Sequence, residues 1–145
     1  MFGMHVTSPA TDDQFARYYD LRWQVLRQPW GKPQGSERDD LEAEAEHAVI
    51  WGPDGAALAV GRLHFNSPTE AQIRYMAVSP AAQGRGLGRQ IVEHLENVAR
   101  RRGATTIVLN SRAAAAGFYE RLGFEPAGAA PTLFDVPHMR MIKRL

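Results

Sequence analysis

Apolar side chains near the start of the chain recur at helical spacing. They stand three or four positions apart and comprise Phe15, Tyr19, Trp23 and Leu26. This period predicts an amphipathic helix over residues 12–27, because side chains at that spacing share one face of a helix. Thr11 and Gln14 have capping-box spacing at its start, and Pro29 follows its end.

Two segments in the second half of the chain have the same period or a helical composition. Between residues 87 and 98 the apolar stripe consists of Leu87, Ile91, Leu95 and Val98. Gly103 follows this stripe, and Gly123 follows an alanine-rich segment over residues 113–122, which places each glycine where helices commonly end. We also expect a loop over residues 28–36 and a short acidic helix from Ser36 to about Ala45.

Short apolar runs between turn residues predict strands. The expected strands cover residues 3–7, 47–51, 57–65, 72–78, 105–109 and 138–143. Turn sequences at Pro53–Gly55 and Asn66–Pro68 separate three consecutive strands, which indicates an antiparallel meander. Residues 126–131 are expected to form a loop. Helices interspersed with strands in this order predict an α/β fold.

The composition is that of an ordinary globular protein. The chain has 145 residues, 44% hydrophobic and 23% charged, and we expect a single domain over residues 1–145. It contains no cysteine, which excludes disulfides, thiolate zinc sites and cysteine nucleophiles. The net charge of +1 gives no indication of a nucleic-acid partner, and the five histidines lack metal-ligand spacing. The lack of cysteine and the histidine spacing lead us to expect no metal. The sequence shows neither a secretory signal nor a membrane span, so we expect a cytoplasmic protein.

Three glycines stand between a predicted strand and a predicted helix. Gly84, Gly86 and Gly88 alternate with other residues just before the helical stripe begins. Glycine lets the backbone turn tightly and approach a ligand, and the first N–H groups of a helix have no partner within the helix. These groups lie at the positive end of the helix dipole, where Arg85 and Arg89 add further charge. The loop therefore predicts a binding site for a pyrophosphate.

The same segment resembles the acyl-CoA loop of the GNAT superfamily of N-acetyltransferases. That loop is written Gln/Arg-x-x-Gly-x-Gly/Ala, and here it reads Gln83-Gly84-Arg85-Gly86-Leu87-Gly88. A strand end of sequence Met-Ala-Val-Ser-Pro precedes it at residues 76–80, and Gly117–Phe124 resembles the family's later helix. The resemblance is close over residues 72–126. It implies a mixed, mainly antiparallel sheet with a V-shaped cleft, flanked by helices.

The resemblance also implies that the chain binds acetyl-CoA. The loop from Gln83 to Arg89 would hold the pyrophosphate. Free backbone groups of the preceding strand end would pair with the pantetheine arm, and that strand end comprises Met76, Ala77 and Val78. Asn110, Arg112 and Phe118 are further candidates for coenzyme contacts. Taken alone, the loop is also compatible with a plain tight turn or a dinucleotide fingerprint, although the latter requires Gly-x-Gly-x-x-Gly and the spacing here is Gly-x-Gly-x-Gly.

Tyr119 is the candidate catalytic residue by this resemblance, because a phenol close to a departing thiolate can donate a proton to it. The alternative is an aromatic side chain packed between helix and sheet.

Many members of the family carry a glutamate as general base where this chain has Gln72, and an amide accepts no proton at neutral pH. Glu70, His64 or a water chain could replace that base. Arg112 stands where many members have an asparagine.

The acceptor site is expected to involve the N-terminal third of the chain and the last strand. Arg22 lies among the apolar positions of the first helix and would suit a carboxylate or phosphate, although a salt-bridged arginine is the alternative. Trp30 is a candidate cleft wall or a loop anchor. His138 opens the last strand, which often borders the acceptor site in this family, and its alternative is a structural role.

These observations together predict transfer of an acetyl group from acetyl-CoA to a primary amine. The amine would attack the thioester directly, without a covalent enzyme intermediate. A catalytically silent acyl-CoA-binding sensor is the alternative, and the glutamine at position 72 favours it mildly. A nucleic-acid-binding module is disfavoured by the nearly neutral net charge. The sequence leaves open the acceptor, the length of the acyl group, and whether the protein is a monomer or a homodimer.

Overall fold

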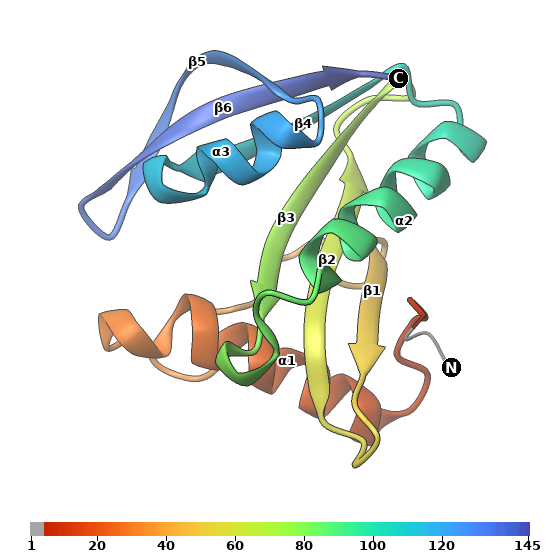
Figure 1. Cartoon of the computed structure of the whole chain (residues 1–145), viewed down its shortest axis with the longest axis vertical. Coiled ribbons are helices and arrows are strands. Elements are labelled where there is room, and N and C mark those ends of the chain that lie inside the picture. Colours follow the sequence, from red (N-terminus) through yellow and green to blue (C-terminus); the bar gives the residue numbers. More distant parts are fainter. Residues whose placement is uncertain (1–4) are drawn as a thin grey trace.

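The computed structural model describes residues 5–145, and these form one mixed sheet flanked by helices (Figure 1). The elements in chain order are α1 (Asp12–Leu26), the 3-10 helix η1 (Gln28–Trp30), β1 (Glu46–Trp51), β2 (Ala57–Phe65), β3 (Glu70–Val78), the 3-10 helix η2 (Pro80–Ala82), α2 (Leu87–Arg101), β4 (Thr106–Arg112), α3 (Ala113–Arg121), β5 (Glu125–Leu133) and β6 (Val136–Arg144). The strand order is β1-β2-β3-β4-β6-β5. Only the β3–β4 pair is parallel among the pairs described. The expected mixed, mainly antiparallel α/β fold is confirmed.

The sheet divides where β3 meets β4. The two strands pair over only three positions, with Glu70–Gln72 opposite Thr106–Val108. Beyond that point they diverge, so that β1, β2 and β3 form one arm of a V and β4, β6 and β5 the other (Figure 1). The V-shaped cleft that the family resemblance implied is therefore present. It leaves the cleft-facing edge of β3 without a strand partner beyond Gln72.

A bulge in β3 lies next to this opening. Val60 and Arg62 of β2 stand two positions apart, whereas their partners Ala77 and Arg74 stand three apart, so β3 carries one extra residue. Tyr75 lies within the bulge and has a φ of 58°, in the left-handed region. Its ring is buried. The bulge turns side chains of β3 toward the cleft without breaking the β2–β3 pair.

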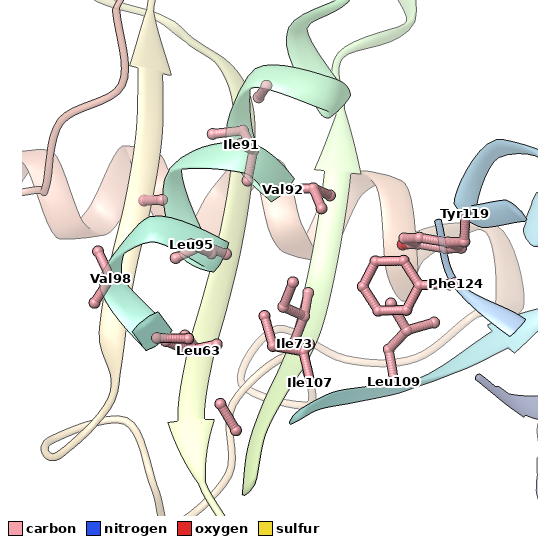
Figure 2. Packing of buried hydrophobic residues seen from close by; sticks show 14 of the residues in the cluster. Leu63, Ile73, Ile91, Val92, Leu95, Val98, Ile107, Leu109, Tyr119 and Phe124 are labelled. Carbon is pink, nitrogen blue, oxygen red and sulfur yellow. The ribbon is translucent and has the colours of Figure 1, made fainter. Parts of the chain in front are cut away.

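Helices cover opposite faces of the β1–β3 arm. α2 packs its apolar stripe against Leu63 and Ile73, as Figure 2 shows, and its Ile91 and Leu95 are fully buried. α1 lies behind the same strands, with Tyr18 and Leu21 against Val49 and Val60. Each fully buried aliphatic side chain contributes about 1.5–3 kcal/mol. The two helices thereby fix β3, and with it one wall of the cleft.

The predicted helices over 12–27, 87–98 and 113–122 are present with nearly the predicted bounds. The capping box of Thr11 and Gln14 forms, because Thr11 accepts from the Gln14 N–H and the Gln14 side chain accepts from the Thr11 N–H. The predicted meander is also confirmed, and the strands predicted over 72–78, 105–109 and 138–143 appear as β3, β4 and β6. Local period and turn chemistry determine these elements.

Three expectations differ from the structure. Part of the predicted strand over residues 3–7 lies outside the described residues, and Thr7 forms an isolated bridge with Val49. The acidic segment 36–45 forms turns rather than a helix, because Asp39 and Glu42 direct their carboxylates at buried arginines. The segment 126–131 belongs to strand β5 rather than a loop. Its prolines are tolerated because β5 is an edge strand with irregular register.

No helix of residues 5–145 is long and apolar enough to cross a membrane. Within the same range, no three of the metal-ligating side chains histidine, aspartate and glutamate gather closely enough to hold a metal ion.

Candidate active site

A cavity of about 480 Å³ lies where β3 and β4 separate. Its walls come from the end of α1, η1, β2, β3, β4, α3 and the β5–β6 hairpin, together with Leu41. It brings together eight of the residues singled out in the sequence, which are Trp30, His64, Gln72, Met76, Asn110, Arg112, Tyr119 and His138. The volume is sufficient for a small molecule. Segments that are distant in the sequence therefore converge on one site.

Tyr119 enters the cavity from α3. Its ring packs edge-on against Phe118 and Phe124, with centroids 5.0 and 5.9 Å away. Figure 2 shows the ring beside Phe124, with the hydroxyl at the end that faces β3. The side chain is only 8% exposed, and burial raises its pKa to about 12 although the charge of Arg112 opposes that shift. A pKa of about 12 keeps the phenol protonated at neutral pH. Because the hydroxyl has no hydrogen-bond partner among residues 5–145, it is available as a donor.

The glycine loop joins β3 to α2 and stands apart from the cavity lining. Gly86 is the N-cap of α2 with a φ of 75°, and no side chain caps the helix there. Gly84 is also left-handed, with a φ of 81°. Arg89 is paired with Glu93 at 2.5 Å. The first N–H groups of α2 are thus left free of side-chain caps, as a phosphate site requires.

Gly88 links this loop to α3. A Cβ built on Gly88 would lie 3.3 Å from the Phe118 ring and 3.5 Å from Val78. The contact explains a glycine inside the first turn of α2, where its backbone is helical and needs no special φ. Phe118 therefore adjoins the loop, while the neighbouring Tyr119 faces the cavity.

The strand end Met76–Val78 forms one rim of the cleft. Ala77 and Val78 pair with Val60 and Ala59 of β2 on one side, whereas β4 has already diverged on the other. Met76 lines the cavity. The backbone of this segment has the unpaired edge that a pantetheine arm would need.

A hydrogen-bonded chain occupies the position expected for a general base. Arg62 donates to His64 Nδ1 at 3.1 Å, and because arginine has no acceptor, His64 Nε2 donates to Asn66 Oδ1 at 3.2 Å. Asn66 Nδ2 donates to Gln72 Oε1 at 2.9 Å. Burial, together with the charge of Arg62, lowers the pKa of His64. Both imidazole nitrogens are engaged, so this histidine offers no lone pair to a substrate.

Glu70, the other considered base, pairs with Arg140 at 3.4 Å and accepts from Asn66 Nδ2 at 2.9 Å. It does not line the cavity. His138 does, and its Nδ1 donates to the Val136 carbonyl at 2.8 Å. In the neutral imidazole, Nε2 then carries the free lone pair. His138 is accordingly the imidazole in this cavity with an acceptor left free among the described residues.

Arg22 lies behind the wall rather than in the cavity. It is fully buried and bonds Glu42 at 3.0 Å, the Glu37 carbonyl at 3.1 Å and the Tyr18 hydroxyl at 2.9 Å. The alternative of a salt-bridged arginine therefore describes this structure, and Arg22 does not line the cavity.

Arg62, also fully buried, completes the same cluster. It bonds Asp39 at 2.6 Å and Glu42 at 2.8 Å. Burial would raise the pKa of Asp39, but hydrogen bonds from Arg62 and Leu41 and the charge of Arg74 lower it to about 2. Sequence reasoning missed this ion-pair cluster. The available signal was an arginine inside the apolar strand 57–65, because a buried cation requires a buried counter-charge.

Sequence reasoning also missed part of the cavity wall. Arg27, Arg74, Tyr75 and Phe134 all line it. Phe134 lies at the tip of the β5–β6 hairpin, with its ring centroid 6.2 Å from that of Trp30. The hairpin was not predicted, so nothing in the sequence brought residue 134 to residue 30. Trp30 is both a cavity wall and an anchor for this tip.

Comparison with known proteins identifies the family. The model of the Acetyltransferase (GNAT) family matches residues 15–124. The N-acetyltransferase YjcF of Bacillus subtilis is 27% identical over 134 residues, which cover 91% of this chain and 94% of that protein. An acyl-CoA N-acyltransferase from Pseudomonas aeruginosa has a similar structure, with a TM-score of 0.81, 26% identity and 99% of each chain covered. A Bacillus subtilis acetyltransferase in complex with CoA shares the fold at a TM-score of 0.74, with 18% identity and 99% of each chain covered. The chain belongs to the GNAT family of acetyltransferases.

Proposed function

We propose that the protein transfers an acetyl group from acetyl-CoA to the primary amine of an acceptor held in the cavity between β3 and β4. Family membership supports an acyltransferase, and the open edge of β3 beside a free helix N-terminus supports a CoA donor. The observation that carries the proposal is the Tyr119 hydroxyl, a protonated donor at the cavity wall without a protein partner among residues 5–145.

The coenzyme would lie along the cleft. Backbone N–H groups of the loop from Gln83 to Arg89 would bind the pyrophosphate at the start of α2. The unpaired edge of Met76–Val78 would pair with the amides of the pantetheine arm. Phe118 and Asn110 border this path, since Phe118 contacts Gly88 and Asn110 lines the cavity. The thioester would then arrive beside Tyr119.

The chemistry requires one proton removed and one delivered. The neutral amine nitrogen attacks the thioester carbonyl carbon, and collapse of the tetrahedral intermediate breaks the C–S bond. Tyr119 donates its proton to the departing thiolate. His138 Nε2 accepts the amine proton, directly or through water, because the Gln72 amide and the engaged His64 offer no base. No covalent enzyme intermediate forms.

The test is release of free CoA thiol from acetyl-CoA with a panel of amines, with the acetylated product identified by mass. We expect amine-dependent thiol release that saturates in both substrates. The alternative is an acyl-CoA-binding module without catalysis, which the glutamine at position 72 favours. Binding of acetyl-CoA without turnover of any amine would support that alternative and contradict the proposal.

A further inference from the structure

The walls of the cavity carry positive but not negative side chains. Three arginines line it, which are Arg27, Arg74 and Arg112. Among residues 5–145, no aspartate or glutamate lines it. A site for a polycationic amine needs carboxylates for the charges that do not react. This lining instead disfavours cations and favours an anion.

Arg27 presents a buried cation to the cavity without a counter-ion. The side chain follows directly after α1 and is 6% exposed. Its Nε donates to the Ser36 carbonyl at 3.0 Å and its Nη1 to the Leu26 carbonyl at 2.9 Å. No carboxylate lies within 4.0 Å of it in the described part of the chain, and the uncharged Tyr75 side chain adjoins it, with its ring centroid 5.6 Å from the guanidinium carbon. Burial lowers the pKa of Arg27. An anion beside the guanidinium would supply the missing counter-charge.

A row of side-chain contacts along the cavity wall begins at Arg27 and ends at Arg112. Arg112 is the last residue of β4, and its guanidinium lies 5.4 Å from the centroid of Trp30. The ring centroids of Trp30 and Phe134 are 6.2 Å apart, and the guanidinium carbon of Arg27 lies 5.1 Å from the Phe134 centroid. Within residues 5–145 Arg112 has no ion pair. We call Arg27, Trp30, Phe134 and Arg112 the arginine–aromatic wall.

The backbone at Phe134 supports a functional reason for this wall. Phe134 and Asp135 form the two-residue turn between β5 and β6, with φ values of 53° and 61°. Such turns favour asparagine and glycine, and a phenylalanine at positive φ is strained. The strained turn places an aromatic ring against Trp30 and Arg27. Strain of this kind persists where a site requires the side chain.

The coenzyme does not account for the cations of the wall. The expected pyrophosphate site is the loop from Gln83 to Arg89, and none of its residues lines the cavity. The 3′-phosphate of CoA lies on the ribose, beyond the pyrophosphate from the thioester, and the pantetheine arm and the acetyl group carry no charge. Arg74 differs from the other two arginines because it is paired with Asp39 at 2.8 Å. Arg27 and Arg112 are therefore the cations left for a ligand other than the coenzyme.

We propose that the acceptor is an amine that also carries a carboxylate or phosphate group, and that the positive charges of Arg27 and Arg112 attract this anion to the arginine–aromatic wall. The proposal rests on the proposed acetyl transfer. It assigns Arg112 to the acceptor rather than to the coenzyme, and it assigns to Arg27 the role that the sequence suggested for Arg22. Amines without an anionic group, and polyamines above all, are poor acceptors.

Matched acceptors test this assignment. One pair is phenylalanine and phenylalaninamide, the other is phosphoethanolamine and ethanolamine, and spermidine represents the polycations. We expect kcat/KM for the anionic member of at least one pair to exceed that of its neutral partner by about 10–100-fold, as charge-assisted hydrogen bonds of this kind imply. The two pairs distinguish a carboxylate from a phosphate. Higher kcat/KM for spermidine, or no preference in either pair, overturns the proposal.

Variants locate the preference. Arg112→Gln and Arg27→Gln should each reduce the ratio of kcat/KM for the anionic acceptor to kcat/KM for its neutral partner by about 10–100-fold. Arg112→Lys should restore part of it. The control is Arg101→Gln, an exposed cation at the end of α2 that does not line the cavity. A preference that survives both cavity substitutions overturns the assignment.

Direct binding separates this inference from the proposed function. Calorimetry with phenylalanine and phosphoethanolamine on the CoA-saturated protein should show binding that Arg112→Gln weakens. If the anionic probes bind but no amine is acetylated, acetyl transfer is wrong and anion recognition stands. If neither anionic probe binds and neutral amines are acetylated, acetyl transfer stands and this inference is wrong.

Discussion

Tyr18 and Tyr119 are both buried, and burial raises the pKa of each to about 12, yet their surroundings are opposite. The Tyr18 hydroxyl lies 3.0 Å from His47 Nδ1 and 3.1 Å from the Gly61 carbonyl, and it accepts from Arg22 Nη2 at 2.9 Å. The Tyr119 hydroxyl has no partner among residues 5–145 and faces the cavity. Burial and pKa alone do not distinguish a structural phenol from a catalytic one. The presence or absence of protein partners does.

The same contrast extends to the arginines of the two regions. Beneath α1, Arg22 and Arg62 bond the carboxylates of Glu42 and Asp39. At the cavity, Arg27 donates to two backbone carbonyls and has no ion pair among residues 5–145. Paired groups in the first region stabilise β2 and β3, whereas unpaired groups in the second remain available to ligands. Substitutions should therefore reduce stability in the first region and function in the second.

The largest expected effect is on turnover in Tyr119→Phe. Loss of the proton donor should lower the single-turnover rate of acetyl transfer by about 10²–10⁴-fold, while the affinity for acetyl-CoA changes little. Packing against Phe118 and Phe124 is retained, because only the hydroxyl is removed. Tyr18→Phe is the matched control, and it should unfold at lower denaturant but transfer acetyl at the wild-type rate. Equal rates for Tyr119→Phe and the wild type would make Tyr119 a packing residue.

Asp39→Asn should test the paired region. It removes one of the two carboxylates that face the fully buried Arg62, and also the partner of Arg74. We expect the free energy of unfolding to fall by about 3 kcal/mol, the lower end for a broken buried pair because Glu42 remains. Denaturant titration measures this loss. Asp40→Asn, on the exposed neighbouring residue, should leave stability within about 0.5 kcal/mol of the wild type. Similar losses in both variants would show that the pairing contributes nothing.

The dependence of stability on acidic pH should also report on the Asp39 carboxylate. The folded-state pKa of Asp39 is about 2, against an ordinary value of 3.8. A lowered folded-state pKa gives a stabilisation that is fully present above pH 4 and is lost as the pH falls from about 4 to about 2. The contribution is about 2 kcal/mol. Denaturant titrations across this window should show a smaller decline in Asp39→Asn than in the wild type. An identical decline would contradict the assigned pKa.

The smallest effect expected is on coenzyme affinity in Gly86→Val. Gly86 and Gly103 both have positive φ, and neither would bring a Cβ within 4 Å of another atom beyond its chain neighbours. Valine should therefore strain the backbone similarly at both ends of α2. Only Gly86→Val should weaken acetyl-CoA binding, by about tenfold, because only it alters the free N–H groups of the helix start. Calorimetry on both variants measures this. Equal affinities would remove the loop from the coenzyme site.

The sequence predicts those parts of the fold and site that depend on local pattern. The helical periods, the meander and the glycine loop before α2 follow from spacing and turn residues. Tyr119, Trp30 and His138 were each singled out separately in the sequence, and the structure brings them to one cavity. Long-range contacts were not predictable. Strand β5 carries Pro126 and Pro131, so its pairing with β6 is visible only once β6 is in place.

The predictions for the charged groups were wrong because the positions of these groups also depend on long-range contacts. The acidic segment 36–45 has the composition of a solvated helix, and only the position of Arg62 explains its turns. The side chains of Arg22 and Arg27 lie one turn or so apart at the end of α1, yet the first is enclosed by partners and the second lines the cavity. Which of two nearby arginines faces a ligand depends on the tertiary contacts around each of them.

The most direct test of the central claim changes the leaving group rather than the protein alone. If Tyr119 donates its proton to the departing thiolate, the rate acceleration from its hydroxyl depends on how basic the leaving group is. Single-turnover rates should be compared for acetyl-CoA and its selenoester analogue, whose selenol is a much stronger acid than a thiol. We predict that the rate defect of Tyr119→Phe, about 10²–10⁴-fold with the thioester, falls at least about tenfold with the selenoester. An equally large defect with both donors would contradict proton donation from Tyr119 to the leaving group.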